Sequence, residues 1–122
     1  MLTGRIRNRQ AWLTVEILNS SGQPLPVEVV LDTGFEGELA LIIPVIRQLG
    51  LQEYDYGFAE LSDGSFARVA IYRATILWDG QRRQVEIIES GNQPLLGMEL
   101  LLGSRVTLDV RDGGPVTVEA LS

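Results

Sequence analysis

The side chains that could carry out chemistry in this sequence belong to few residue types. The 122 residues contain no Cys, no His and no Lys, so every basic residue is an Arg. These absences exclude a thiol nucleophile, a Ser-His triad, a Schiff-base lysine and metal sites built on Cys or His. If the chain is an enzyme, its acid–base chemistry must come from Asp, Glu or Tyr.

Asp32 is the strongest candidate for such a group. It ends the apolar run Val29-Val30-Leu31 and is followed by Thr33 and Gly34. Asp and Gly also favour ordinary turns, so a plain strand-to-turn junction is the simplest alternative. The remaining aspartates have no comparable context, and three of them directly precede Gly in predicted hairpin turns: Asp63, Asp79 and Asp112.

Asp32-Thr33-Gly34 after apolar residues resembles the active-site signature of the retropepsin and pepsin superfamily of aspartic proteases. The second signature of that superfamily, two apolar residues and a Gly followed by an apolar segment, matches Leu95-Leu96-Gly97 and the residues after it. More narrowly, residues 32–35 resemble a bacterial and archaeal retropepsin-like group whose motif continues with Phe. Two positions depart from the retroviral pattern: Phe35 stands where Ala is usual, and Met98 stands where an Arg supports the dimer.

The resemblance implies a mechanism and an assembly. In this superfamily two close carboxylates share one proton, activate a water molecule and protonate the scissile carbonyl, with no metal and no cofactor. Gly34 would allow a tight turn, and Thr33 would hold the two active-site loops together. Because the chain carries one Asp-Thr-Gly, the second carboxylate must come from a second copy in a two-fold symmetric homodimer.

A hairpin between the two signatures is the expected flap. Its predicted tip is Leu61-Ser62-Asp63-Gly64-Ser65, and it would close over an extended peptide or protein substrate. An ordinary surface hairpin is the equally simple alternative. Phe35, Leu61 and Phe66 are candidates for lining substrate pockets, although core packing is the commoner role of such residues.

The remaining pattern is that of an all-β protein. Segments rich in β-branched and aromatic residues predict strands at 12–17, 26–31, 66–78, 84–88, 106–110 and 116–118. Pro44 and Gly50 bracket one predicted short helix, and Gly97 and Gly103 bracket another. We therefore expect a single domain over residues 1–122, with a closed acid-protease barrel and one or two short helices.

Composition also narrows the partners. The net charge of −6 argues against nucleic acid as a ligand. The longest apolar run, residues 39–46, is too short to cross a membrane, and the N-terminus does not resemble a secretory signal, so a cytoplasmic location is expected.

Three hypotheses remain for function. The first is a homodimeric aspartic endopeptidase. The second is a catalytically inactive retropepsin-fold module for peptide binding or dimerisation. The third is an unrelated small β-barrel that binds a small ligand, with Asp32 merely in a turn.

Overall fold

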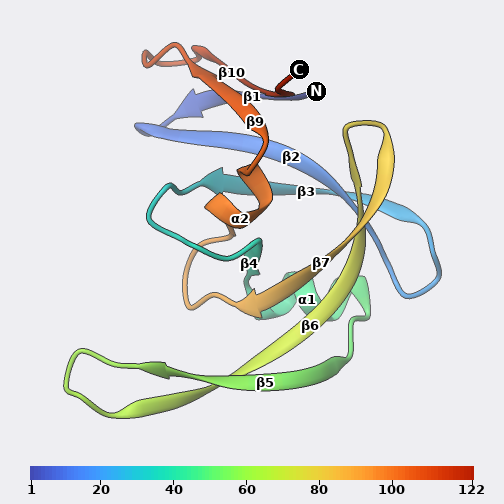
Figure 1. Ribbon diagram of the computed structural model, residues 1–122, viewed down its shortest axis with the longest axis vertical. Helices are drawn as coiled ribbons and strands as arrows, with labels where there is room; N and C mark the ends of the chain where they lie inside the picture. Colours follow the sequence, from blue (N-terminus) through green and yellow to red (C-terminus); the bar gives the residue numbers. More distant parts are fainter.

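The computed structural model describes residues 1–122 and consists of one mixed ten-stranded sheet with two short helices (Figure 1). The strand order is β5-β6-β7-β4-β8-β3-β2-β1-β10-β9, and β6 also pairs with β2. The strands are β1 (Leu2–Arg7), β2 (Gln10–Leu18), β3 (Pro24–Leu31), β4 (Leu39–Leu41), β5 (Glu53–Glu60), β6 (Phe66–Trp78), β7 (Gln81–Glu89), β8 (Leu95–Leu96), β9 (Ser104–Leu108) and β10 (Pro115–Ala120). The helices are α1 (Ile43–Leu49) and α2 (Met98–Leu101).

Alternating burial explains why the long strands form. In β2 the side chains of Leu13, Val15 and Ile17 are buried, and the residues between them are more exposed. This period of two places one face of a strand against a core. The core is one cluster of twenty buried apolar residues, and no polar or charged residue is fully buried.

The short helices have the terminal residues that the sequence predicts. Pro44 lies in the first turn of α1, and Gly50 ends that helix in the left-handed conformation with φ 70°. Glycine adopts this conformation without the steric cost that other residues incur. The second helix, α2, is shorter than its bracketing glycines suggest, because it covers only Met98–Leu101.

The all-β prediction is confirmed, and β6 spans the predicted residues 66–78. Pairing in β9 ends earlier than predicted. The Asp109 N–H donates to the Pro115 carbonyl (3.1 Å), and the chain then turns, so Asp109 and Val110 lie outside the strand. The closed barrel stays a prediction. No helix of the chain is long and apolar enough to span a membrane.

Several chain reversals lie on one side of the molecule. In Figure 1 the end of β3, the turn between β1 and β2, the loop between β9 and β10, and the tip of the β5–β6 hairpin all lie on the left. The β1–β2 turn consists of Asn8 and Arg9, which both have positive φ angles of 52° and 61°. Asn tolerates this conformation, but an Arg there is unusual. This side of the molecule contains Asp32.

Candidate functional site

Asp32 follows the last residue of β3 and is held by main-chain hydrogen bonds. Its N–H donates to the Leu96 carbonyl (2.9 Å), and its Oδ1 accepts the Gly34 N–H (2.8 Å). The side chain is partly exposed, and Oδ2 makes no hydrogen bond within the chain. One carboxylate oxygen is therefore fixed, and the other is available to a ligand or a water molecule.

The structure brings the two predicted signatures side by side. β3 and β8 pair in parallel, with Val30 opposite Leu95 and Leu31 opposite Leu96. Residues 35–38 then accept three hydrogen bonds from the residues that start α2: Gly97 N–H to the Glu38 carbonyl (3.0 Å), Met98 N–H to the Phe35 carbonyl (2.8 Å) and Glu99 N–H to the Gly37 carbonyl (3.2 Å). The loop that carries Asp32 is thus fixed along its length.

Close packing explains the glycine of the second signature. A Cβ atom on Gly97 would lie 2.3 Å from the Gly37 carbonyl oxygen and 2.6 Å from Cδ2 of Phe35. Gly97 has an ordinary φ of −106°, so lack of space requires glycine here. Phe35, which the sequence left as a possible pocket residue, packs inside its own loop against Gly37 and Gly97.

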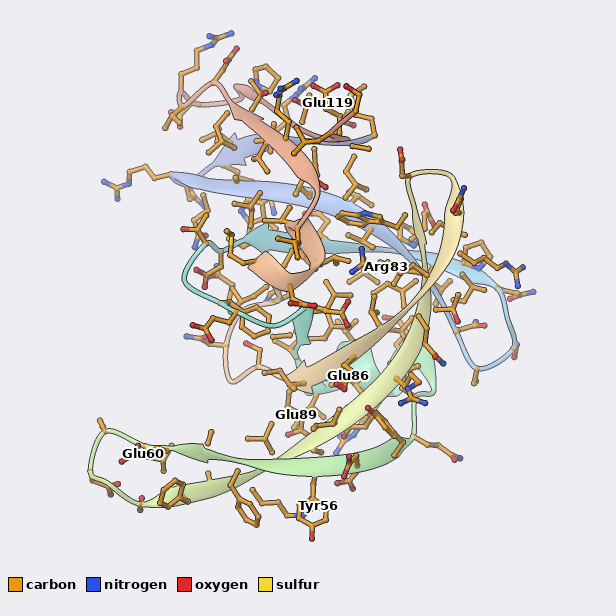
Figure 2. All side chains as sticks on the ribbon, in the orientation of Figure 1. Tyr56, Glu60, Arg83, Glu86, Glu89 and Glu119 are labelled. Carbon is orange, nitrogen blue, oxygen red and sulfur yellow. The ribbon has the colours of Figure 1, made fainter.

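Glu38 is a positioning residue that the sequence analysis missed. Its side chain is only 16% exposed; Oε1 accepts the Glu86 N–H (2.9 Å), and Oε2 accepts from Nη2 of Arg83 (3.2 Å). Arg83 and Glu86 both lie on β7 (Figure 2). Glu38 therefore anchors the Asp32 loop to a third strand. Its spacing from Asp32 gave no signal of this role, because the partner is a backbone N–H of a distant strand.

An open hollow of about 450 Å³ lies beside Asp32. Asp32 is the only carboxylate among its lining residues, and Arg9 is the only cation. At its border the side-chain amides of Gln10 and Gln93 exchange two hydrogen bonds (3.0 and 2.9 Å), which tie the start of β2 to the loop before β8. The lining residues are Ile6, Arg9, Gln10, Ala11, Val30, Leu31, Asp32, Thr33, Gln93, Leu95, Leu108 and Val110. The exposed Thr33 makes no side-chain hydrogen bond within the chain.

The predicted hairpin is present as β5–β6, with its tip at Leu61–Ser65. Leu61 N–H donates to the Ser65 carbonyl (2.7 Å), and Gly64 adopts a φ of 85°. Asp63 Oδ1 accepts the Ser65 N–H (2.9 Å) and its hydroxyl (2.5 Å), and these hydrogen bonds lower the pKa of the Asp63 carboxyl. Hydrogen bonds to the ionised form have this effect in general. The tip is therefore an ordered turn while Asp63 is ionised.

The two faces of this hairpin differ. Its inner face borders a groove of about 670 Å³, to which Ala59, Leu61, Ala67 and Val69 contribute. Its outer face carries exposed aromatic side chains, and Tyr56 points away from the rest of the molecule in Figure 2. Leu61 thus lines this groove, and its role in binding substrate stays a prediction, whereas Phe66, opposite Glu60 and 66% exposed, does not line the groove.

The base of the hairpin is fixed to the body of the molecule. The Tyr54 hydroxyl donates to Glu86 Oε2 (2.8 Å), which raises the pKa of Tyr54. The Tyr72 hydroxyl donates to Glu89 Oε1 (3.0 Å). Burial and this hydrogen bond raise the pKa of Tyr72. The base therefore has side-chain anchors to β7, while the tip makes its hydrogen bonds within the hairpin.

Comparison with known proteins supports the fold. No protein-family model matches the sequence, and no curated protein matches it. A solved structure described as a retropepsin-like aspartic protease from Rickettsia conorii superposes with a TM-score of 0.62 over 100% of this chain and 92% of the other. The two sequences are 16% identical. The chain therefore has a retropepsin-like fold.

Proposed function

We propose that this protein is an aspartic endopeptidase whose active form is a homodimer. The observation that carries the proposal is the position of Asp32: it is the only carboxylate in an open hollow, and its loop is joined by hydrogen bonds to Leu96 and Gly97. In a retropepsin-like fold this position is where the resemblance places the catalytic carboxylate. The additional β2–β6 pairing supports a closed barrel, with Ile17 opposite Ile76.

Two copies of Asp32 would form the catalytic pair. Two carboxylates in close contact cannot both ionise readily, so the pair keeps one proton over an acidic pH range. The ionised member would take a proton from a water molecule, which attacks the carbonyl carbon of the peptide bond. The protonated member would donate its proton to the carbonyl oxygen.

The surrounding residues have supporting roles in this mechanism. The Gly34 N–H fixes one Asp32 oxygen, and Thr33, which has no side-chain partner within the chain, would hold the two loops together across the axis. The tip from Leu61 to Ser65 would act as a flap over an extended peptide that reaches Asp32, and the groove of the inner face would hold another part of that peptide. No metal or cofactor enters the scheme, and a cytoplasmic location remains part of the proposal.

The proposal is tested by proteolysis with purified protein. Wild-type protein should cut a denatured protein or a peptide library at acidic pH, and pepstatin-like statines should inhibit cutting. Asp32→Asn should abolish it, because an amide cannot accept the proton of the attacking water. Asp79→Asn is the matched control, because Asp79 is an exposed turn residue that should leave the rate unchanged.

Equal cutting by wild type and Asp32→Asn would refute the proposal. If wild-type protein binds peptides without cutting them, and Asp32→Asn binds them equally well, the result would instead support the alternative of an inactive retropepsin-fold peptide-binding or dimerisation module.

A further inference from the structure

Two exposed apolar side chains border the hollow that contains Asp32. Leu108, at the end of β9, is 41% exposed, and Val110, in the following turn, is 74% exposed. The deeper wall of the same hollow is apolar and buried, with Ile6, Ala11 and Val30 each below 9% exposure. One face of the molecule thus carries both apolar protrusions and an apolar depression.

The turn that carries Val110 is ordered and not frayed. Ile6 and this turn exchange two main-chain hydrogen bonds, from the Gly113 N–H to the Ile6 carbonyl (2.9 Å) and from the Ile6 N–H to the Gly114 carbonyl (2.8 Å). Within the turn, the Gly114 N–H donates to the Arg111 carbonyl (2.8 Å). An ordered backbone therefore presents the exposed Val110 side chain to solvent, and a partner that covered it would cost the turn little conformational entropy.

The first and last strands of the chain, β1 and β10, are not available to bind a second copy through a shared sheet. β10 lies between β1 and β9, and β1 lies between β2 and β10, so both edges of both strands are already paired (Figure 1). Neither strand can therefore gain a second copy as a new neighbour, and the free edge at this end of the sheet is that of β9.

We propose that a second copy of the chain binds at this face, with Leu108 and Val110 of each copy packed against the hollow of the other. The inference rests on the proposed function, because the two-fold axis must pass beside Asp32 if two of these carboxylates meet. A two-fold interface uses the same patch on both copies, so the patch must contain both protrusions and a depression to be self-complementary. This face has both.

Charges on the face are also suited to self-association. Arg9 lines the hollow and has no ion pair within the chain. Asp109 lies between Leu108 and Val110, and its one ionic contact is with the exposed Arg111 at 4.0 Å. Each copy therefore brings a cation to the hollow and an anion to the protruding turn, so the two signs face each other when one turn enters the other hollow.

The test is the self-association of single variants, measured by sedimentation velocity over a range of protein concentrations. Val110→Asp should weaken the dimer by at least about 100-fold, because it replaces an apolar side chain with a hydrated carboxylate against the apolar wall of the hollow. Circular dichroism should show an unchanged fold, because Val110 is mostly exposed. Phe58→Asp is the matched control: Phe58 is 67% exposed on the outer face of the β5–β6 hairpin, and this change should leave the dimer intact.

Because sedimentation needs no substrate, its result is independent of the proteolysis assay. A dimeric wild type with a monomeric Val110→Asp and a dimeric Phe58→Asp supports the inference. If Val110→Asp dimerises as tightly as wild type, the inference is overturned while the endopeptidase proposal stands. If Val110→Asp disrupts the wild-type dimer but Asp32→Asn cuts as well as wild type, the endopeptidase proposal is overturned and the dimer face stands.

Discussion

Gly97→Ala tests the close packing that positions Asp32. The added Cβ would lie 2.3 Å from the Gly37 carbonyl oxygen, 2.6 Å from Cδ2 of Phe35 and 2.7 Å from the Phe35 carbonyl oxygen. Two of these three atoms belong to the backbone, so a side-chain rotation cannot relieve the clash. The two segments must separate, and the hydrogen bonds between them must lengthen.

The expected cost follows from these contacts. Forcing a methyl group into a packed site costs roughly 1–3 kcal/mol. Weakening the hydrogen bonds from Gly97 to Glu38 and from Met98 to Phe35 adds roughly 1 kcal/mol. We therefore expect about 3 kcal/mol less stability, which is a fall of roughly 1.5 M in the urea midpoint if m is about 2 kcal/mol/M.

The assay is urea unfolding at one fixed protein concentration, since self-association stabilises the folded state. Gly91→Ala is the matched control, because a Cβ on Gly91 meets no atom within 4 Å. In a Phe35→Ala background, Gly97→Ala should retain more than half of its cost, because the backbone oxygens remain. If Gly97→Ala and Gly91→Ala unfold at the same urea concentration, the packing argument is refuted.

Two further predictions concern single carboxylates. Glu38→Ala should lower the free energy of unfolding by roughly 1–3 kcal/mol, because it leaves the Glu86 N–H without its acceptor. Glu36→Ala, in the same loop, should change this free energy by less than about 0.5 kcal/mol. Equal losses of stability for the two variants in urea unfolding would contradict the role of Glu38 as an anchor. At the hairpin tip, the hydrogen bonds from Ser65 lower the pKa of Asp63 in the folded state. These hydrogen bonds should therefore be fully formed above the ordinary Asp pKa, and they should be lost only as the pH falls through the lowered pKa. The Ser65 amide shift in an NMR titration measures this midpoint, and a midpoint at or above 3.8 would argue against the ordered turn.

The sequence predicted the elements that are regular over a long span. The β-branched and aromatic run from Phe66 to Trp78 is one uninterrupted strand. Ala74 and Ile76 in its second half are buried in the core, and its first half is paired with β5. The strand β5 was not separated from its surroundings, because Tyr54, Tyr56 and Phe58 are exposed on the outer face and give no burial signal. The very short β4 and β8 form through partners distant in the sequence, which local pattern cannot indicate.

The candidate site was predictable only in part. Asp32 and Leu95-Leu96-Gly97 could be named from their resemblance to family signatures, and the fold brings them together. The Glu38 anchor depends on a backbone N–H of β7, which no side-chain motif records. The exposure of Val110 was also missed, because the alternation of apolar and polar residues from Val106 to Val110 predicted that the strand continues to residue 110, whereas it ends at Leu108.

The most direct test of the central claim, that the site needs one Asp32 from each of two copies, is a mixing experiment. Wild-type protein is unfolded and refolded with a nine-fold excess of the Asp32→Asn variant, at a concentration that keeps both dimeric, and its cleavage rate is compared with that of the same amount of wild type alone. With random pairing, about one wild-type chain in ten finds a wild-type partner, so the account predicts a rate of roughly one-tenth. An unchanged rate would show that one Asp32 suffices and would contradict the account.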